Sequence, residues 1–147
     1  MFNRVKFYRR TRNRLLLAKE HVFVVGNKYL LEFEIDQLPK YFNPNSRVHW
    51  SKKYRESKLF LNLVWVKVLE HGAPVHPIKL AKLTLTRCSA TAPDFDNLVS
   101  SFKAVTDALV KCKVLLDDKI ENIQEQQYKI EKAPKGKGKI KIRVEEV

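Results

Sequence analysis

Four aspartates border one short segment of this sequence, although the chain as a whole is rich in positive charge. They are Asp94, Asp96, Asp117 and Asp118. Magnesium prefers oxygen ligands, and one or two carboxylates together with the phosphate groups of a substrate usually hold it. In that position the ion activates water and neutralises charge on a phosphodiester under attack. The clustering of these acids therefore predicts a magnesium site suited to phosphodiester chemistry.

A lysine shares a predicted helix face with these acids. The segment 94–113 has the apolar spacing of one helix, and at about 100° per residue Lys103 falls within about 40° of Asp96. Its ammonium group could stabilise transition-state charge or orient the attacking water. Asp107 could take part directly, or could simply pair with Lys103 on the surface. The opposite stripe is expected to be buried and consists of Leu98, Phe102, Val105 and Leu109.

The acids also have purely structural interpretations. Asp94 or Asp96 could cap the amino terminus of the predicted helix, because both closely follow Pro93 at the end of a predicted strand. Asp117 and Asp118 could form a plain turn before the next strand. The residue types alone leave these alternatives open.

Alternating and helical patterns predict the elements that must position the acids. Strands are expected at 21–25, 29–36, 80–87, 119–132 and 139–147, and helices at 51–70 and 94–113. The dipeptide Gly26-Asn27 suits a tight turn between the first two strands, and the glycine-rich loop 133–138 predicts a hairpin between the last two. We therefore predict an α/β (α+β) fold in a single domain. It has a β-α-β-α-β-β mixed sheet packed by two helices, preceded by a basic hairpin or arm.

The first predicted helix follows a loop that contains Pro39 and Pro44. Ser51 is expected to cap this helix. Its apolar positions recur at helical spacing and are Leu59, Leu63, Val64 and Val66.

Bulk composition points to one globular domain. The chain has 147 residues, of which 44% are hydrophobic and 31% charged, a balance typical of a chain with a single core rather than a disordered one. The sequence contains neither an apolar run long enough to cross a bilayer nor the features of a secretory signal, so a cytoplasmic protein without membrane contact is expected. Cys88 and Cys112 fit no zinc spacing and are expected to be buried thiols.

The excess of basic residues favours a polyanionic partner. Lysine and arginine number 29 against 16 acidic residues, a net charge of +13 that most often indicates nucleic acid. A solvated lysine-rich surface and a lipid surface are the alternatives. The residues expected to contact phosphates precede or open the first helix and are Arg47, Lys52, Lys53 and Arg55. His49 could act as a base or contact phosphate, but we favour a role in which it and Trp50 fix the loop by packing and hydrogen bonding.

The ordered motifs resemble the signature of the RusA family of Holliday junction resolvases. The matching elements are Asp94-Phe95-Asp96-Asn97-Leu98, then Lys103, then Asp107-Ala108-Leu109, then Asp117-Asp118 with Ile120. Upstream, Pro39, Asn43-Pro44-Asn45 and Arg47-Val48-His49-Trp50 are similar to the loop of that family, and 139–147 is similar to its basic final strand. The resemblance covers about residues 29–147. It implies a RusA-like endonuclease domain at 29–147 and leaves 1–28 as a basic amino-terminal extension.

Membership of that family implies a function and a set of site residues. The resemblance implies a homodimer that nicks opposed strands of a four-way DNA junction, with Mg²⁺, or Mn²⁺ as a substitute, in each site. It implies that Asp94, Asp96 and Asp118 bind the metal. It also implies that Asp117 assists them and that Lys103 is the catalytic lysine. It also implies a bacterial or phage-encoded protein.

One departure and three rival interpretations accompany the resemblance. Val99-Ser100-Ser101 add three residues before Lys103, nearly one helical turn, relative to the best-known pattern. The rivals are a nuclease of broader branched-DNA or flap specificity, a non-catalytic binder of structured nucleic acid, and a structural basic protein.

Overall fold

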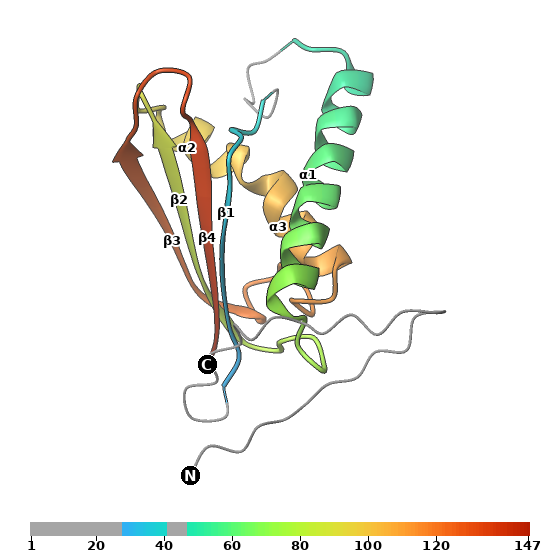
Figure 1. The fold of residues 1–147 in the computed structure, drawn as a ribbon. Coiled ribbons are helices and arrows are strands. Elements are labelled where there is room, and N and C mark those ends of the chain that lie inside the picture. Colours follow the sequence, from blue (N-terminus) through green and yellow to red (C-terminus); the bar gives the residue numbers. More distant parts are fainter. Residues whose placement is uncertain (1–27, 41–46) are drawn as a thin grey trace.

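Four strands form a mixed sheet in the order β1-β4-β2-β3 (Figure 1). The structure is a computed structural model that describes residues 28–40 and 47–147. In chain order the elements are β1 (Leu30–Ile35), α1 (Trp50–His71), β2 (Ala81–Ser89), α2 (Phe95–Ser101), α3 (Lys103–Lys111), β3 (Ile123–Lys132) and β4 (Lys139–Glu146). The predicted mixed α+β fold in a single domain is confirmed.

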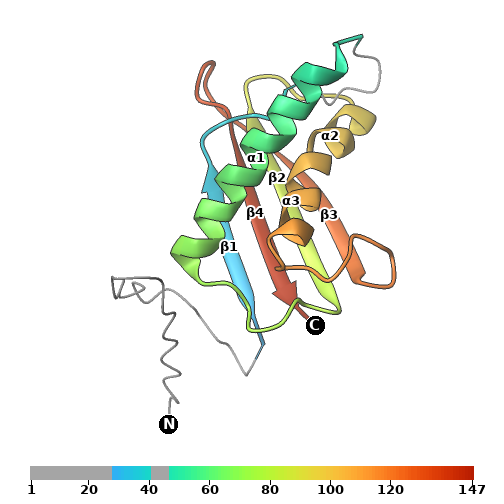
Figure 2. The same ribbon diagram turned by 90° about the vertical axis from the view of Figure 1, so that its right-hand side faces the viewer.

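The helices cover one face of the sheet, with α1 packed against α3 and β1 (Figure 2). Every second side chain along each strand points toward the helices, because successive Cβ atoms point to opposite faces of the sheet. The fully buried core includes Leu31, Leu83, Leu85, Ile140 and Ile142 from the sheet, with Phe60, Val64, Phe102, Val105 and Leu109 from the helices. The apolar stripe predicted for 94–113 is buried as expected.

The start and the buried face of α1 differ from the prediction. Trp50 opens the helix and His49 is its N-cap, with His49 Nδ1 accepting the Ser51 N–H at 3.3 Å, so Ser51 is not the cap. The buried positions are Glu56, Phe60, Val64 and Val68. Leu59 and Val66 are exposed, because both faces of this helix carry apolar residues and only packing selects one of them.

The predicted helix 94–113 is two helices that meet at Phe102. The Phe102 N–H bonds to the Val99 carbonyl at 3.1 Å, a tighter turn than an α-helix makes. Hydroxyl groups bond back to carbonyls on both sides of the break: Ser100 to Asp96, Ser101 to Leu98 at 2.7 Å, and Thr106 to Phe102 at 3.2 Å. Such bonds compete with the helix ladder and bend it. The break coincides with the three residues that depart from the RusA pattern.

The loop 133–138 is not a hairpin, because β2 lies between β3 and β4. β2 pairs with β3 in parallel and with β4 antiparallel. Only Ile123 of β3 is buried, so this polar strand suits the sheet edge, whereas β4 buries Ile140, Ile142 and Val144 in the interior. β3 also begins later than predicted, because Lys119 to Asn122 form a turn closed by the Asn122 N–H and the Lys119 carbonyl at 2.9 Å.

Several expectations fall outside the residues that the structure describes. They are the strand at 21–25, the turn at Gly26-Asn27, the basic extension except for its last residue, Lys28, and the motif Asn43-Pro44-Asn45. Within 28–40 and 47–147, no helix combines the length and apolar character needed to cross a bilayer. Cys88 and Cys112 are both buried free thiols, as predicted.

Candidate active site

Asp94 and Asp96 lie just beyond the carboxyl end of β2, where α2 begins. In α/β units, ligands commonly bind outside the carboxyl ends of strands. Asp94 occupies the N-cap position of α2 with an extended backbone, but its side chain makes no capping hydrogen bond. Asp96 is in the first turn, and both side chains are exposed. The capping interpretation of the Asp94 carboxylate is therefore wrong, and the carboxylate is available to a ligand.

Lys103 joins α3 to the loop before β3. Its Nζ lies 2.6 Å from Asp118 Oδ2 and 2.9 Å from Asp107 Oδ1. The hydrogen bonds that Lys103 donates, first to Asp107 and then to Asp118, raise its pKa well above the usual lysine value. The ammonium therefore keeps its proton at neutral pH and is not suited to accepting one.

Asp117 is held within its own loop. Its Oδ1 accepts the Asp118 N–H at 2.8 Å, and its Oδ2 lies 3.0 Å from Lys119 Nζ. The hydrogen bond from Lys119, followed by that from the Asp118 amide, lowers the Asp117 pKa. Asp117 thus orders the turn that presents Asp118, as the turn interpretation predicts, while Asp118 faces Lys103.

The expected site residues form two groups rather than one. No hydrogen bond or ion pair in the described part of the chain links Asp94 or Asp96 to Lys103 or Asp118. Among these residues, no three His, Cys, Asp or Glu side chains are close enough together to hold a metal ion. The donor set still fits magnesium chemically, because Asp94 and Asp96 offer exposed carboxylate oxygens and this ion needs only one or two carboxylates.

Two residues near this site were not predicted from the sequence. Tyr128 of β3 packs its ring against Phe95 at 6.2 Å and Phe102 at 6.0 Å between centroids, so it supports the start of α2 and the helix break. Arg87 is half-buried near the end of β2, and burial lowers its pKa. The alternation of β2 places Arg87 on the helix-covered face with Leu85, a signal that was available in the sequence.

The basic residues predicted to contact phosphates gather at the amino-terminal end of α1. We define the α1 patch as the cations Arg47, Lys52, Lys53, Arg55 and Lys58 together with the aromatic residues Trp50 and Tyr54. The first turn of α1 contains no acid, and these cations form no ion pair with another described residue. Glu56 faces inward, where its Oε1 accepts the Lys40 N–H at 3.0 Å. The positive charge of the patch is therefore not balanced by neighbours in the described structure.

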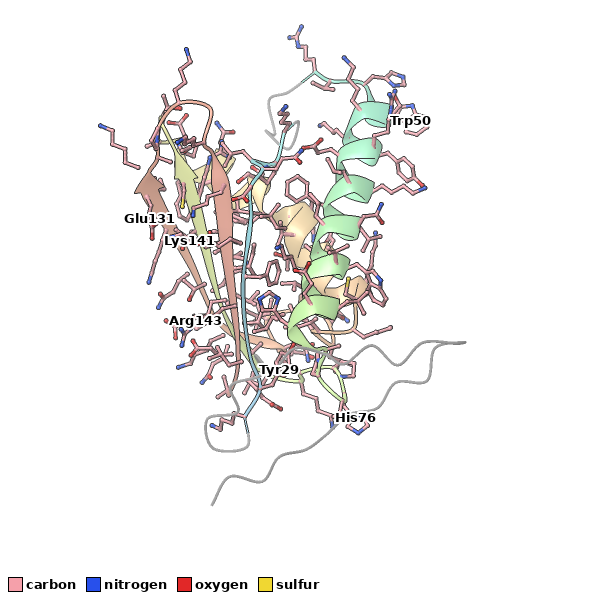
Figure 3. The ribbon with its side chains drawn as sticks, in the orientation of Figure 1. Tyr29, Trp50, His76, Glu131, Lys141 and Arg143 are labelled. Carbon is pink, nitrogen blue, oxygen red and sulfur yellow. The ribbon has the colours of Figure 1, made fainter. Side chains whose placement is uncertain are left out.

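Basic residues on the outer sheet face, the side away from the helices, are instead paired with carboxylates. The pairs are Lys82 with Glu125, Lys139 with Glu34, Lys141 with Glu131, and Arg143 with both Glu32 and Glu145. Figure 3 shows Glu131, Lys141 and Arg143 on this face. The final strand is basic in sequence, yet its cations are neutralised by adjacent strands.

Comparison with known proteins adds no family assignment. No protein-family model matches the chain, and no curated protein matches it at a significant level. The resemblance to RusA resolvases therefore rests on the motif residues alone.

Proposed function

We propose that this protein is a magnesium-dependent endodeoxyribonuclease of the RusA type that resolves four-way DNA junctions by paired symmetric nicks. Its partners would be branched DNA and a second copy of the chain, since a two-fold dimer matches the approximate symmetry of a junction. The observation that supports this most directly is the contact of Lys103 with Asp118. These two motif residues are fifteen positions apart in sequence and lie 2.6 Å apart in the fold.

Each site residue has a role in this proposal. Asp94 and Asp96 would hold the ion, with Asp118 as the third acid and Asp117 ordering the loop. When bound, magnesium supplies an activated water and neutralises charge on the phosphate. Lys103, kept protonated by Asp107 and Asp118, offers positive charge to the phosphodiester. The cations of the α1 patch would bind the DNA backbone.

A second candidate is a non-catalytic protein that binds structured nucleic acid. Within the described residues no three acidic, histidine or cysteine side chains form a metal-binding group, and this alternative does not require one. Both candidates predict binding to branched DNA, and only the first predicts cleavage. A nuclease that cuts forks and flaps as readily as junctions would use the same acids.

A cleavage assay separates these candidates. The protein is incubated with a four-way junction, a fork and a linear duplex, each in magnesium, in manganese or in EDTA. A resolvase gives paired symmetric nicks on the junction alone, and EDTA abolishes them. Equal cutting of the fork and the junction would replace the resolvase with a broader branched-DNA nuclease. Tight junction binding without cleavage in either metal would leave the non-catalytic binder.

Asp96→Asn tests the site within the same assay. Cleavage should fall by more than about 100-fold, since even residues behind metal ligands cost about 10–100-fold when removed. Junction binding should persist or improve, because one negative charge near the phosphates is gone. Asp36→Asn removes an exposed acid just after β1 and is the matched control. Equal activity of the two variants would remove Asp96 from the site.

A further inference from the structure

Two aromatic side chains in the first turns of α1 are exposed to solvent. Trp50 is 70% exposed and Tyr54 is 59% exposed. The buried face of α1 begins only at Glu56, so the first turns extend beyond the core. Trp50 lies at the amino-terminal end of α1 (Figure 3), and the His49 ring contacts it at 5.5 Å between centroids. At typical aromatic areas, the two rings leave on the order of 250 Å² in water.

The two rings lie on one face of α1 with cations beside them. Residues four apart on a helix are neighbours, so Trp50 and Tyr54 form a continuous ridge. At about 100° per residue, Lys53 falls on one side of this ridge and Lys58 on the other. Aromatic rings set among lysines and arginines are the arrangement that binds single strands, with bases stacking on the rings and phosphates on the cations.

We propose that Trp50 and Tyr54 form a stacking platform for unpaired nucleobases, with the neighbouring cations binding the phosphates of the same strand. The inference rests on the proposed function for its branched substrate and adds how bases that unpair at a branch point are recognised. A duplex offers phosphates but keeps its bases stacked inside. The platform therefore favours branched or single-stranded DNA over duplex.

Charge argues for a nucleic acid strand rather than a second copy of this chain on the same patch. A two-fold interface places the same surface on both partners. Two α1 patches would then face each other with their cations in apposition and no described acid in the first turn of α1 to balance them. A polyanionic strand neutralises those cations instead.

The chain provides a matched control on the same helix. Its only other tryptophan, Trp65, is 44% exposed. Trp65 borders a cavity of about 200 Å³ that is also lined by Val68, Leu69 and Pro74. Near it, Lys67 pairs with Glu70 at 3.4 Å. Lys111 and Lys113 line the same cavity, so Trp65 also has cations nearby, but it has no aromatic partner four residues away as Trp50 has in Tyr54.

Two single-tryptophan variants test the platform. In Trp65→Phe the fluorescence comes from Trp50 alone, and in Trp50→Phe from Trp65 alone. Each is titrated in EDTA with a thymidine oligonucleotide of about twelve nucleotides, the size range that one single-strand-binding module covers. An abasic oligonucleotide of equal length supplies the same phosphates without bases. We expect the thymidine strand to quench Trp50 and not Trp65, and the abasic strand to quench neither.

Affinity measurements then separate stacking from charge. Trp50→Ala and Tyr54→Ala should each weaken binding of the thymidine strand by about 5–100-fold, the usual effect of losing one stacked base. The dependence on salt should stay unchanged, because phosphate contacts are kept. Circular dichroism checks that each variant is folded. Equal quenching of Trp50 by thymidine and abasic strands would overturn the platform and leave phosphate binding alone.

Two further controls identify other occupants of the patch. A Trp50 spectrum that changes with protein concentration, without DNA, would assign the ridge to a second copy. A blue shift with vesicles of phosphatidylserine and phosphatidylcholine, absent with DNA, would assign it to a membrane surface. Because all binding is measured in EDTA, a chain that fails to cleave DNA can still pass this test. If the protein cleaves junctions but the thymidine strand does not quench Trp50 fluorescence, only the stacking platform is contradicted and the proposed function stands.

Discussion

The outer sheet face and the α1 patch carry similar cations in opposite electrostatic settings. On the sheet, Lys139 and Lys141 each lie within 2.7 Å of a carboxylate. On α1, the cations have no such partner among the described residues, and exposed rings lie between two of them, Lys53 and Lys58. Paired cations of this kind lie beside the carboxylates of the sheet and present little net charge. Unpaired ones release counterions when a polyanion binds. The net charge of +13 thus does not by itself locate the binding surface.

Neutralising the α1 patch should produce the largest effect. Lys52→Gln, Lys53→Gln and Arg55→Gln together should reduce the slope of log affinity against log salt by about two to three and weaken junction binding by about 100-fold near physiological salt. Fluorescence anisotropy at several salt concentrations measures both quantities. Lys67, Lys79 and Lys111, replaced together by glutamine, remove the same charge elsewhere. An equal loss in both triple variants would mean that total charge, not the patch, determines binding.

Glu56 tests how the patch is positioned. This buried carboxylate, 7% exposed, anchors the chain before α1 through the Lys40 amide. Glu56→Ala leaves that donor unpaired and should lower the free energy of unfolding by about 1–3 kcal/mol. Urea unfolding followed by tryptophan fluorescence measures the change. Glu56→Gln keeps an acceptor for the Lys40 amide and should lower the free energy of unfolding by less. The salt slope of DNA binding should stay the same in both variants. A changed slope would place Glu56 among the charges that face DNA.

Removing acids from the outer sheet face should create a weaker version of the α1 patch. Glu34→Gln with Glu131→Gln frees Lys139 and Lys141 from their partners. Binding to duplex DNA should strengthen by only a few-fold, because the freed lysines lie on a separate face and add non-specific contacts. Asp36→Asn with Glu121→Gln removes two exposed acids elsewhere as a control. No difference between the two double variants would show that pairing on the sheet does not mask its cations.

Lys103 is intermediate between the paired cations of the sheet and the unpaired cations of α1, since it pairs with carboxylates yet its side chain is 58% exposed. Replacing it should give the smallest of the predicted effects, a change in the free energy of unfolding. Its raised pKa means that the pairing stabilises the fold below the ordinary lysine value of about 10.4 and is lost as pH rises through the higher folded value. The difference in unfolding free energy between wild type and Lys103→Met should be a few tenths of a kcal/mol. It should stay constant between about pH 6 and pH 9. A decline between pH 7 and pH 9 would instead indicate that Lys103 titrates near neutrality. Lys79→Met is the exposed control.

Local pattern predicted much of the fold. Alternation located β1, β2 and β4 within a few residues, because side chains on a half-buried strand must alternate between core and water. Helical spacing located α1 and the buried stripe of 94–113. The spacing of the acids also placed Asp94 and Asp96 correctly at the start of a helix after a strand. These features depend on neighbours in sequence, so the sequence by itself determined them.

Tertiary packing decided the remaining features, because each depends on residues far apart in the chain. β4 lies between β1 and β2 since its inner residues are buried beneath the helices, whereas the polar β3 is left at the edge. The helix ends at Phe102, whose ring is buried and packed against Tyr128 from a distant strand. Lys103 meets Asp118 only because the loop after α3 brings Asp118 back to the start of that helix. Similarly, the sequence showed a basic chain, but only the fold paired the cations of the sheet and left those of α1 beside exposed rings.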